Sequence, residues 1–217
     1  MSDGFEKVTS VESVHPKVDS DRSAARMRHM GDHREQFVDL DATADTAEQR
    51  AYEVREFLRS RGLAEPDERA GDYLWPDAIV DQAGPAWQSA WHHPSNRPQP
   101  SWWTTIAVVS PTDVDDQAFF AMDSTGPPSC RTCGKEFDED AFWSSFKGWY
   151  ETRREPELSC GSCGGRGLMG DQDTTSAAVV GRVAIVIERS SPEVVTEMLR
   201  ALRSDLGGRW AYVHMHL

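Results

Sequence analysis

Residues 179–217 read VVGRVAIVIERSSPEVVTEMLRALRSDLGGRWAYVHMHL, and this stretch decides the fold. Its first part, residues 179–187, is a run of β-branched and small apolar residues, which predicts a buried strand. Its last part, residues 210–217, predicts a final strand, and a helix is expected between the two. A strand, a helix and a strand joined by short loops predict a right-handed crossover between parallel strands.

The helix between these strands is marked at both ends and along one face. Ser191 and Pro192 supply an N-cap and a first-turn proline, and Gly207 with Gly208 ends the helix. Its buried stripe consists of Val195, Met198, Leu199, Leu202 and Leu206.

The elements upstream are a helix and two short strands. The pair Thr46 and Gln49 fits a capping box, and it opens a helix that closes at Gly62. The core-facing positions of this helix are Ala51, Val54, Phe57 and Leu58. Alternating residues from Trp102 to Val109 predict a strand, and residues 117–122 predict a second strand that forms a hairpin with it.

These patterns predict an α+β fold: a small mixed β-sheet flanked by helices, with an inserted zinc ribbon. Residues 1–40 are expected to be a flexible N-terminal extension, with only a weak helical pattern over residues 23–38. Residues 41–123 hold the helices and first strands of the α+β domain, including a short helix from Gly84 and a proline-rich linker at residues 92–100. The ribbon is expected at residues 124–170, and residues 171–217 complete the domain.

The ribbon prediction depends on the only four cysteines of the chain. They form two C-x-x-C-G motifs, or knuckles, with 26 residues between them: Cys130 and Cys133, then Cys160 and Cys163. Two residues between thiolates let one turn aim both sulfurs at a single ion, so the pattern predicts a tetrahedral zinc site. Four thiolates leave no open coordination position, and the site is therefore expected to be structural.

Two alternatives to zinc stay open. Iron in a rubredoxin-like site uses a similar set of four cysteines. A redox role is the other, because residues 160–163 have the C-G-x-C form of a disulfide oxidoreductase. That chemistry requires a helix N-terminus to lower the thiol pKa, and the glycines after Cys163 oppose a helix there.

The other candidate groups are aromatic, histidine and aspartate clusters. Six aromatic residues between the knuckles form either a small core or a recognition surface, and four of them fall on one helix face: Phe142, Phe146, Trp149 and Tyr150. His214 and His216 share a strand face, but an H-x-H pair needs a third metal ligand, and a half-exposed polar strand face explains the pair better. Asp113, Asp115 and Asp116 fit solvated turn chemistry better than a metal site.

Charge and hydropathy narrow the class of partner. The 217-residue chain has 36 acidic and 23 basic residues, a formal charge of −13, of which residues 1–129 carry −11. An acidic protein gains no counterion release on DNA or RNA, so nucleic acid is not the expected partner. No run of about 18 apolar residues predicts a membrane span. Neither a signal peptide nor cross-linked cysteines are indicated, and a cytoplasmic location is expected.

The chain resembles a family of uncharacterised actinobacterial proteins over roughly residues 46–217. The matching segments are residues 52–62, residues 84–87, the two cysteine knuckles, and the stretch from Ser191 and Pro192 to Tyr212, Val213 and His214. The resemblance implies a helix, a Gly-Pro-aromatic segment, strands, an inserted zinc ribbon and a C-terminal strand-helix-strand, and it implies no activity.

The sequence therefore favours a non-catalytic, zinc-binding interaction protein whose acidic and aromatic surface binds another protein. An inhibitor of the immunity or antitoxin type is one concrete form. The alternatives are an accessory nucleic-acid protein using Arg153, Arg154 and Arg166, and an enzyme with a pocket lined by His214, His216 or the aspartate turn. No motif of a known catalytic class is present in the sequence.

Overall fold

The C-terminal stretch folds as a strand, a helix and a strand. The computed structural model describes residues 33–67, 79–87, 104–110, 117–122, 125–188 and 192–216. In it, β9 (Val183–Glu188) leads to α5 (Pro192–Ala201), which continues through one π-helical turn, η3 (Leu202–Leu206), and then β10 (Trp210–His216). Gly207 ends the helical part with φ 67°, a left-handed value that glycine adopts without strain. The predicted strand, helix and strand are confirmed.

A strand from the other end of the described chain lies between β9 and β10. It is β1 (His33–Asp39), which pairs with each of them in antiparallel register. Because both pairings are antiparallel, β9 and β10 run parallel to one another, as the crossover prediction requires, but they are not neighbours. Residues 33–40 therefore do not belong to a flexible extension, and residues 33–38 form a strand instead of part of a weak helix.

The same arrangement recurs on the other side of β9. From β1 the chain forms α2 (Ala47–Ser60), β2 (Ala64–Pro66), β3 (Ile79–Ala83) and β4 (Thr105–Val109). The six-stranded sheet has the order β10-β1-β9-β4-β3-β2, with every neighbouring pair antiparallel. Thus β1 and β4 are parallel with β9 between them, and two split β-α-β units interlock as in ferredoxin-like folds.

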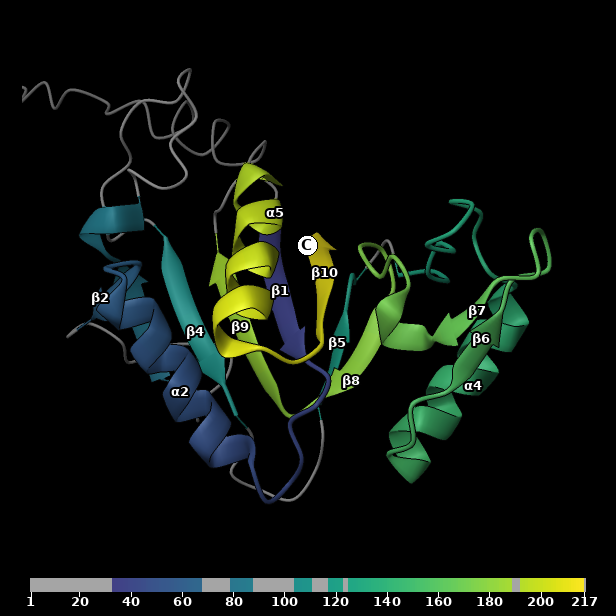
Figure 1. Cartoon of the computed structure of the whole chain (residues 1–217), viewed down its shortest axis with the longest axis horizontal. Coiled ribbons are helices and arrows are strands. Elements are labelled where there is room, and N and C mark those ends of the chain that lie inside the picture. The colour runs from purple at the N-terminus through teal and green to yellow at the C-terminus, as the bar shows by residue number, and fades with distance from the viewer. Residues whose placement is uncertain are drawn as a thin grey trace, which may run out of the picture. The chain divides into compact units, whose positions relative to one another are not determined.

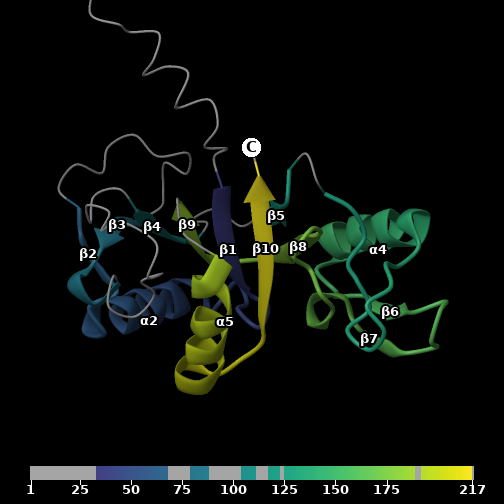
Figure 2. The ribbon, with the colours of Figure 1, turned by 90° about the horizontal axis from the view of Figure 1, so that it is seen from above.

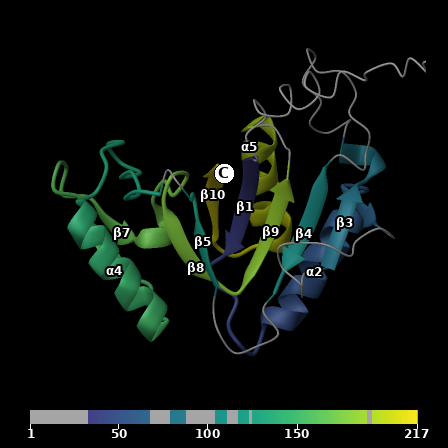
Figure 3. The ribbon, with the colours of Figure 1, turned by 180° about the vertical axis from the view of Figure 1, so that it is seen from behind.

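Both α2 and α5 cover one face of this sheet, as Figure 1 shows, and Figure 3 shows the strands from the opposite side. The burial pattern explains it: Val54 and Leu58 of α2, Met198 of α5 and Leu202 of η3 are all fully buried against this face. The strands contribute a buried row of large apolar side chains: Phe37, Ile106, Ile185, Ile187 and Trp210. Burial of this area supplies the main driving force for docking the helices.

The N-terminus of α2 departs from the predicted capping box. The helix begins where expected, after Thr46, but the Thr46 side chain caps no helix amide. Instead its hydroxyl accepts from the amide of Thr43 at 2.9 Å, because Thr46 already has helical dihedral angles. Gln49 likewise bonds Glu53, one turn along, in place of the helix start.

A second, two-stranded sheet lies against the other face. It consists of β5 (Gln117–Phe120) and β8 (Ala178–Gly181), paired antiparallel. The predicted hairpin between the β4 and β5 segments is wrong, since both edges of β4 are occupied by β3 and β9. The single strand predicted at residues 179–187 is divided at Gly181 into β8 and β9. A Cβ atom at Gly181 would lie 2.3 Å from Cγ1 of Val38, so the chain crosses β1 where a larger residue has no room.

The predicted ribbon is inserted between β5 and β8. It contains α4 (Glu139–Thr152), the two-stranded sheet β6 (Glu157–Ser159) with β7 (Arg166–Leu168), and the short 3-10 helix η2 (Met169–Asp171). Figure 2 shows these elements together, beside β8. The fold is therefore α+β, as predicted. The predicted tail at residues 1–22, the linker at residues 92–100 and the aspartate turn at residues 113–116 lie outside the described residues.

Candidate metal centre

The two cysteine knuckles have nearly identical backbones. In each, the amide of the glycine that follows the second cysteine donates to the carbonyl of the first: Gly134 to Cys130 at 2.7 Å, and Gly164 to Cys160 at 2.8 Å. These glycines have φ of 70° and 72°, left-handed values that favour glycine. The turn chemistry of the C-x-x-C-G motif thus directs both sulfurs of a knuckle to one side.

The four sulfurs meet at one point, so the structure brings all four predicted ligands together. Their Sγ atoms all lie within 4.8 Å of one another, and Cys130–Cys163 and Cys133–Cys160 are each 3.7 Å apart. A tetrahedral ion with metal–sulfur bonds of about 2.3 Å requires sulfur–sulfur distances of about 3.8 Å. The cluster therefore has the dimensions of a metal site with four thiolate ligands.

The surroundings of the cluster lower the pKa of two thiols and raise the pKa of a third. Amide N–H groups of Cys133 and Thr132 point at the Cys130 sulfur and lower its pKa to about 6. Amides of Cys163 and Ser162 lower the Cys160 pKa in the same way. The amide of Gly165 acts similarly on Cys163, but the neighbouring thiols outweigh it and raise its pKa to about 12. A bound cation would relieve that crowding, because it stabilises all four thiolates together.

The redox alternative lacks the feature it needs. Residues 161–165 form a turn that leads into β7, so no helix begins at Cys160 or Cys163. All four cysteines are free thiols in the structure, and the 3.7 Å contacts run between the knuckles. The arrangement is that of a shared ligand set and not of a CxxC redox pair.

The aromatic residues of the ribbon divide between core and surface. Phe142, Phe146 and Trp149 are buried on the inner face of α4, where they pack with β8 and other parts of the second core. Tyr150, expected on that face, is instead 42% exposed, and Trp143 is 37% exposed. The helical register explains the correction: residues 143 and 150 are seven apart, so they lie together on the outer face.

The ribbon is fastened to the sheet through polar contacts as well as this core. Ser129 and Asp173 exchange two backbone hydrogen bonds of 2.9 and 3.0 Å beside the first knuckle. Arg209, just before β10, forks onto Glu155 with bonds of 2.7 and 3.0 Å and also contacts Asp171. These carboxylates raise the pKa of Arg209, although its burial opposes the shift.

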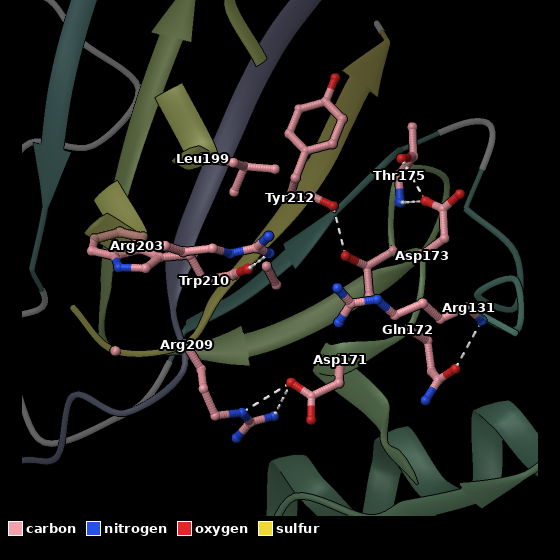
Figure 4. A pocket seen from close by; sticks show the side chains of 14 residues that line it. Arg131, Asp171, Gln172, Asp173, Thr175, Leu199, Arg203, Arg209, Trp210 and Tyr212 are labelled. Atoms are coloured by element: carbon pink, nitrogen blue, oxygen red, sulfur yellow. Dashed lines mark hydrogen bonds and ion pairs between the residues drawn. The ribbon is translucent and has the colours of Figure 1, made fainter. Parts of the chain in front are cut away.

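A pocket of about 450 Å³ lies along this seam, as Figure 4 shows. Arg131 and Asp171 line it from the ribbon side, and Arg203 and Tyr212 line it from η3 and β10. Most of its polar groups already have partners: Arg203 donates to the carbonyl of Trp210 at 2.8 Å, and Arg209 binds carboxylates. His214 and His216 do not line this pocket, so it lends no support to the enzyme hypothesis.

The H-x-H pair has neighbours that the sequence did not suggest. His214 lies opposite Glu35 of β1, and His216 lies opposite His33. The Nδ1 atom of His214 is 2.9 Å from Glu35 Oε2, and its Nε2 atom is 3.1 Å from Nδ1 of His33. The H-x-E pattern of residues 33–35 alternates as H-x-H does, but it lay in the segment assigned to the flexible extension.

The chain matches no family model, no curated protein and no solved structure. The resemblance to an actinobacterial family therefore stays a prediction, and function has to be argued from the chain's own residues.

Proposed function

We propose that this chain is a non-catalytic binding protein whose cysteine site holds a structural zinc ion and whose helix α4 binds a basic protein. The observation that carries the proposal is the pair Trp143 and Tyr150, two large aromatic side chains exposed on the outer face of a rigid helix. Tyrosine and tryptophan are enriched in protein interfaces because they offer large contact areas with few rotatable bonds.

The support around α4 is unusually rigid for an exposed surface. Its inner face is anchored by three buried aromatic residues, and the two cysteine knuckles precede and follow it in the chain. Asp138 caps its N-terminus by accepting from the amide of Ala141 at 2.9 Å, and Arg153 closes its C-terminus with φ 60°. A preformed surface reduces the entropic cost of binding a partner.

The charge around this surface suits a basic partner. Exposed carboxylates surround the start of α4: Glu136, Asp138, Glu139 and Asp140. The one lysine of the helix, Lys147, is paired with Glu151 at 3.8 Å. Arg153 stacks on Tyr150 at 4.7 Å, at the opposite end of α4 from the four carboxylates, so it does not neutralise them. An acidic rim beside aromatic contacts favours a partner with lysine or arginine next to an apolar residue.

The charge of the chain and the placement of its arginines favour this role over nucleic-acid binding. The overall charge is −13, and the described acidic residues outnumber the basic ones around α4. Arg166 lies in β7 beside the second knuckle, whereas Arg153 lies at the C-terminus of α4. The two arginines therefore do not lie together on one helix face. Among the described residues, no helix is long and apolar enough to cross a membrane. An inhibitor of the immunity or antitoxin type is the concrete form we favour.

Zinc is the proposed ion because four thiolates at tetrahedral distances and a closed coordination shell suit it best, with iron as the competitor. Elemental analysis of gently purified protein decides between them: we expect one zinc per chain, and one iron would replace zinc in the proposal without altering the binding surface.

The binding proposal is tested by capture from host extracts with three forms of the full chain. We expect the unaltered protein and Tyr52→Ala to retain the same basic protein, and the Trp143→Ala, Tyr150→Ala double variant to lose it. Tyr52 is the matched control, since it is an aromatic residue 54% exposed on α2. Thermal unfolding confirms that the variants are folded. Retention of the partner by the double variant, or recovery of nucleic acid in its place, contradicts the proposal.

A further inference from the structure

One face of the β1–β10 pair gathers three histidines and a buried glutamate outside the cysteine site. Side chains alternate along a strand, so His33 and Glu35 of β1 share a face with His214 and His216 of β10. The register sets them opposite one another, His33 to His216 and Glu35 to His214. The rings of His33 and His214 have centroids 5.2 Å apart, and those of His33 and His216 are 4.6 Å apart.

Glu35 is almost entirely enclosed. Its side chain is 1% exposed, and its described partners are the Tyr212 hydroxyl and the His214 ring, both of which meet Oε2. No lysine or arginine among the described residues forms an ion pair with it. A buried carboxylate is costly unless a positive charge lies close by. Tyr212 is a neutral donor and supplies no such charge.

Hydrogen-bond chemistry sets the direction of both contacts with Glu35. A carboxylate oxygen accepts, so the Tyr212 hydroxyl donates its proton to Glu35. The remaining Glu35 partner, Nδ1 of His214, must also donate, and this fixes the tautomer of His214 with its Nε2 lone pair directed away from Glu35.

A carboxylate that fixes one nitrogen of a histidine prepares the other nitrogen to bind a metal ion. Nε2 of His214 faces Nδ1 of His33 at 3.1 Å, close to the separation of about 3.3 Å expected for two imidazole ligands of one tetrahedral ion. We propose that His33, His214 and His216 bind a divalent transition-metal ion of the nickel or zinc class, with Glu35 as the residue that positions His214.

The third ligand has to move to complete the site. Among the described residues, only the four cysteines already bring three or more ligand atoms within 4.8 Å of one another. His216 is exposed and its ring already lies beside that of His33, so a side-chain rotation brings its nitrogen toward the ion. The cost of such a rotation is small beside the gain from a metal–imidazole bond. The ion would also supply the charge that Glu35 lacks.

The test is a calorimetric titration of the full chain with Ni²⁺ after one equivalent of Zn²⁺ has been added for the cysteines. At about pH 7.5 an unperturbed imidazole is neutral and able to bind metal. We expect one Ni²⁺ per chain, binding at least tenfold weaker in His33→Ala and His214→Ala, and about 10–100-fold weaker in Glu35→Gln. Glu188→Gln is the matched control, because that carboxylate faces Arg34 on the other side of the sheet, and its affinity should be unchanged.

Two results would contradict the proposed histidine metal site. Absence of saturable binding below about 1 mM Ni²⁺, the upper limit of a specific interaction, overturns it. Equal affinity in His214→Ala and the unaltered chain also overturns it, since the ion would then lie elsewhere. If Glu35→Gln fails to fold, the exposed His33 still decides the result, because its truncation leaves the core intact. The outcome is independent of whether α4 binds a protein.

Discussion

Arg209 is expected to hold the ribbon against the sheet, and replacing it by methionine tests this directly. Its guanidinium forks onto Glu155 with bonds of 2.7 and 3.0 Å and reaches Asp171 at 2.9 Å. Glu155 follows α4 and is 13% exposed, and its Oε1 also accepts from the amide of Gly170 at 2.7 Å. Methionine keeps the apolar stem and removes every charged contact, so the change isolates the fork.

The expected loss can be worked from these contacts. Each charge-assisted hydrogen bond to the largely buried Glu155 contributes about 1.5–3 kcal/mol, and removing both leaves that carboxylate with one donor. Asp171 and Asp41 are 41% and 49% exposed, so their contacts with Arg209 are screened and add little. We expect a net loss of about 3 kcal/mol, which for a domain of this size lowers Tm by roughly 6–12 °C.

Urea unfolding followed by tryptophan fluorescence measures this loss. Arg209→Lys should recover about half of it, because lysine keeps the charge but not the planar fork. Arg200→Met is the matched control: Arg200 pairs with Glu197 along α5 at 72% exposure, and its removal should cost less than about 0.5 kcal/mol. If Arg209→Met proved no more destabilising than Arg200→Met, the contacts of Arg209 with Glu155 and Asp171 would not be what holds the ribbon against the sheet.

Four further predictions concern a close contact, an open helix position, a raised pKa and the metal centre. Gly181→Ala should lower the free energy of unfolding by about 1–3 kcal/mol, because its Cβ would lie 2.3 Å from Val38. The double variant with Val38→Ala should lower it by less than the sum of the two single-variant losses. Gly148→Ala, where a Cβ meets open space inside α4, should instead gain about 0.5–1 kcal/mol in the same urea assay. The raised pKa of Tyr212 means that its contribution to the free energy of unfolding is complete below about pH 10. Above that pH the contribution should decline by up to about 1.4 kcal/mol per pH unit, and unfolding measurements on Tyr212→Phe should lack this slope. Chelation of the metal should abolish amide-exchange protection in residues 129–169 first, while β1 and β9 exchange as before. Simultaneous loss of protection in the ribbon and in these two strands would show that the metal does not stabilise the ribbon independently of the sheet.

The parts of the fold that were predictable are those with local sequence signals. Pro192 and Gly207 mark the ends of the α5 region, and residues 183–187 are apolar enough to specify β9 without reference to other strands. The strand β1 was not recognised, because residues 33–36 are all polar, Phe37 and Val38 are the only apolar residues of the segment, and no polar–apolar alternation marks it as a strand. Two of its buried polar side chains have partners more than 150 residues away, Glu188 for Arg34 and His214 for Glu35. Tertiary contacts of this range leave no pattern in a local window.

The candidate sites show the same contrast. The clustering of the four cysteines was predictable from their spacing, since each knuckle is complete within five residues and only two knuckles have to meet. The partners of His214 could not be found, because Glu35 comes from a strand whose register is set by the whole sheet. Tyr150 was misplaced for a different reason: helical periodicity orders side chains around an axis but does not fix where the buried arc ends.

The position of β1 between β9 and β10 also sets the order of events during synthesis. Asp39 pairs with Val183, 144 positions further along the chain, so at about 5–20 residues per second the strand waits roughly 7–30 s for its first neighbour. The cysteine knuckles are separated by only 26 residues, and their loop closes at little entropic cost. The ribbon can thus acquire its ion and fold while the sheet is still missing its final strands. The metal centre would then form before β9 and β10 exist, and these last strands would join the sheet beside a ribbon that is already folded.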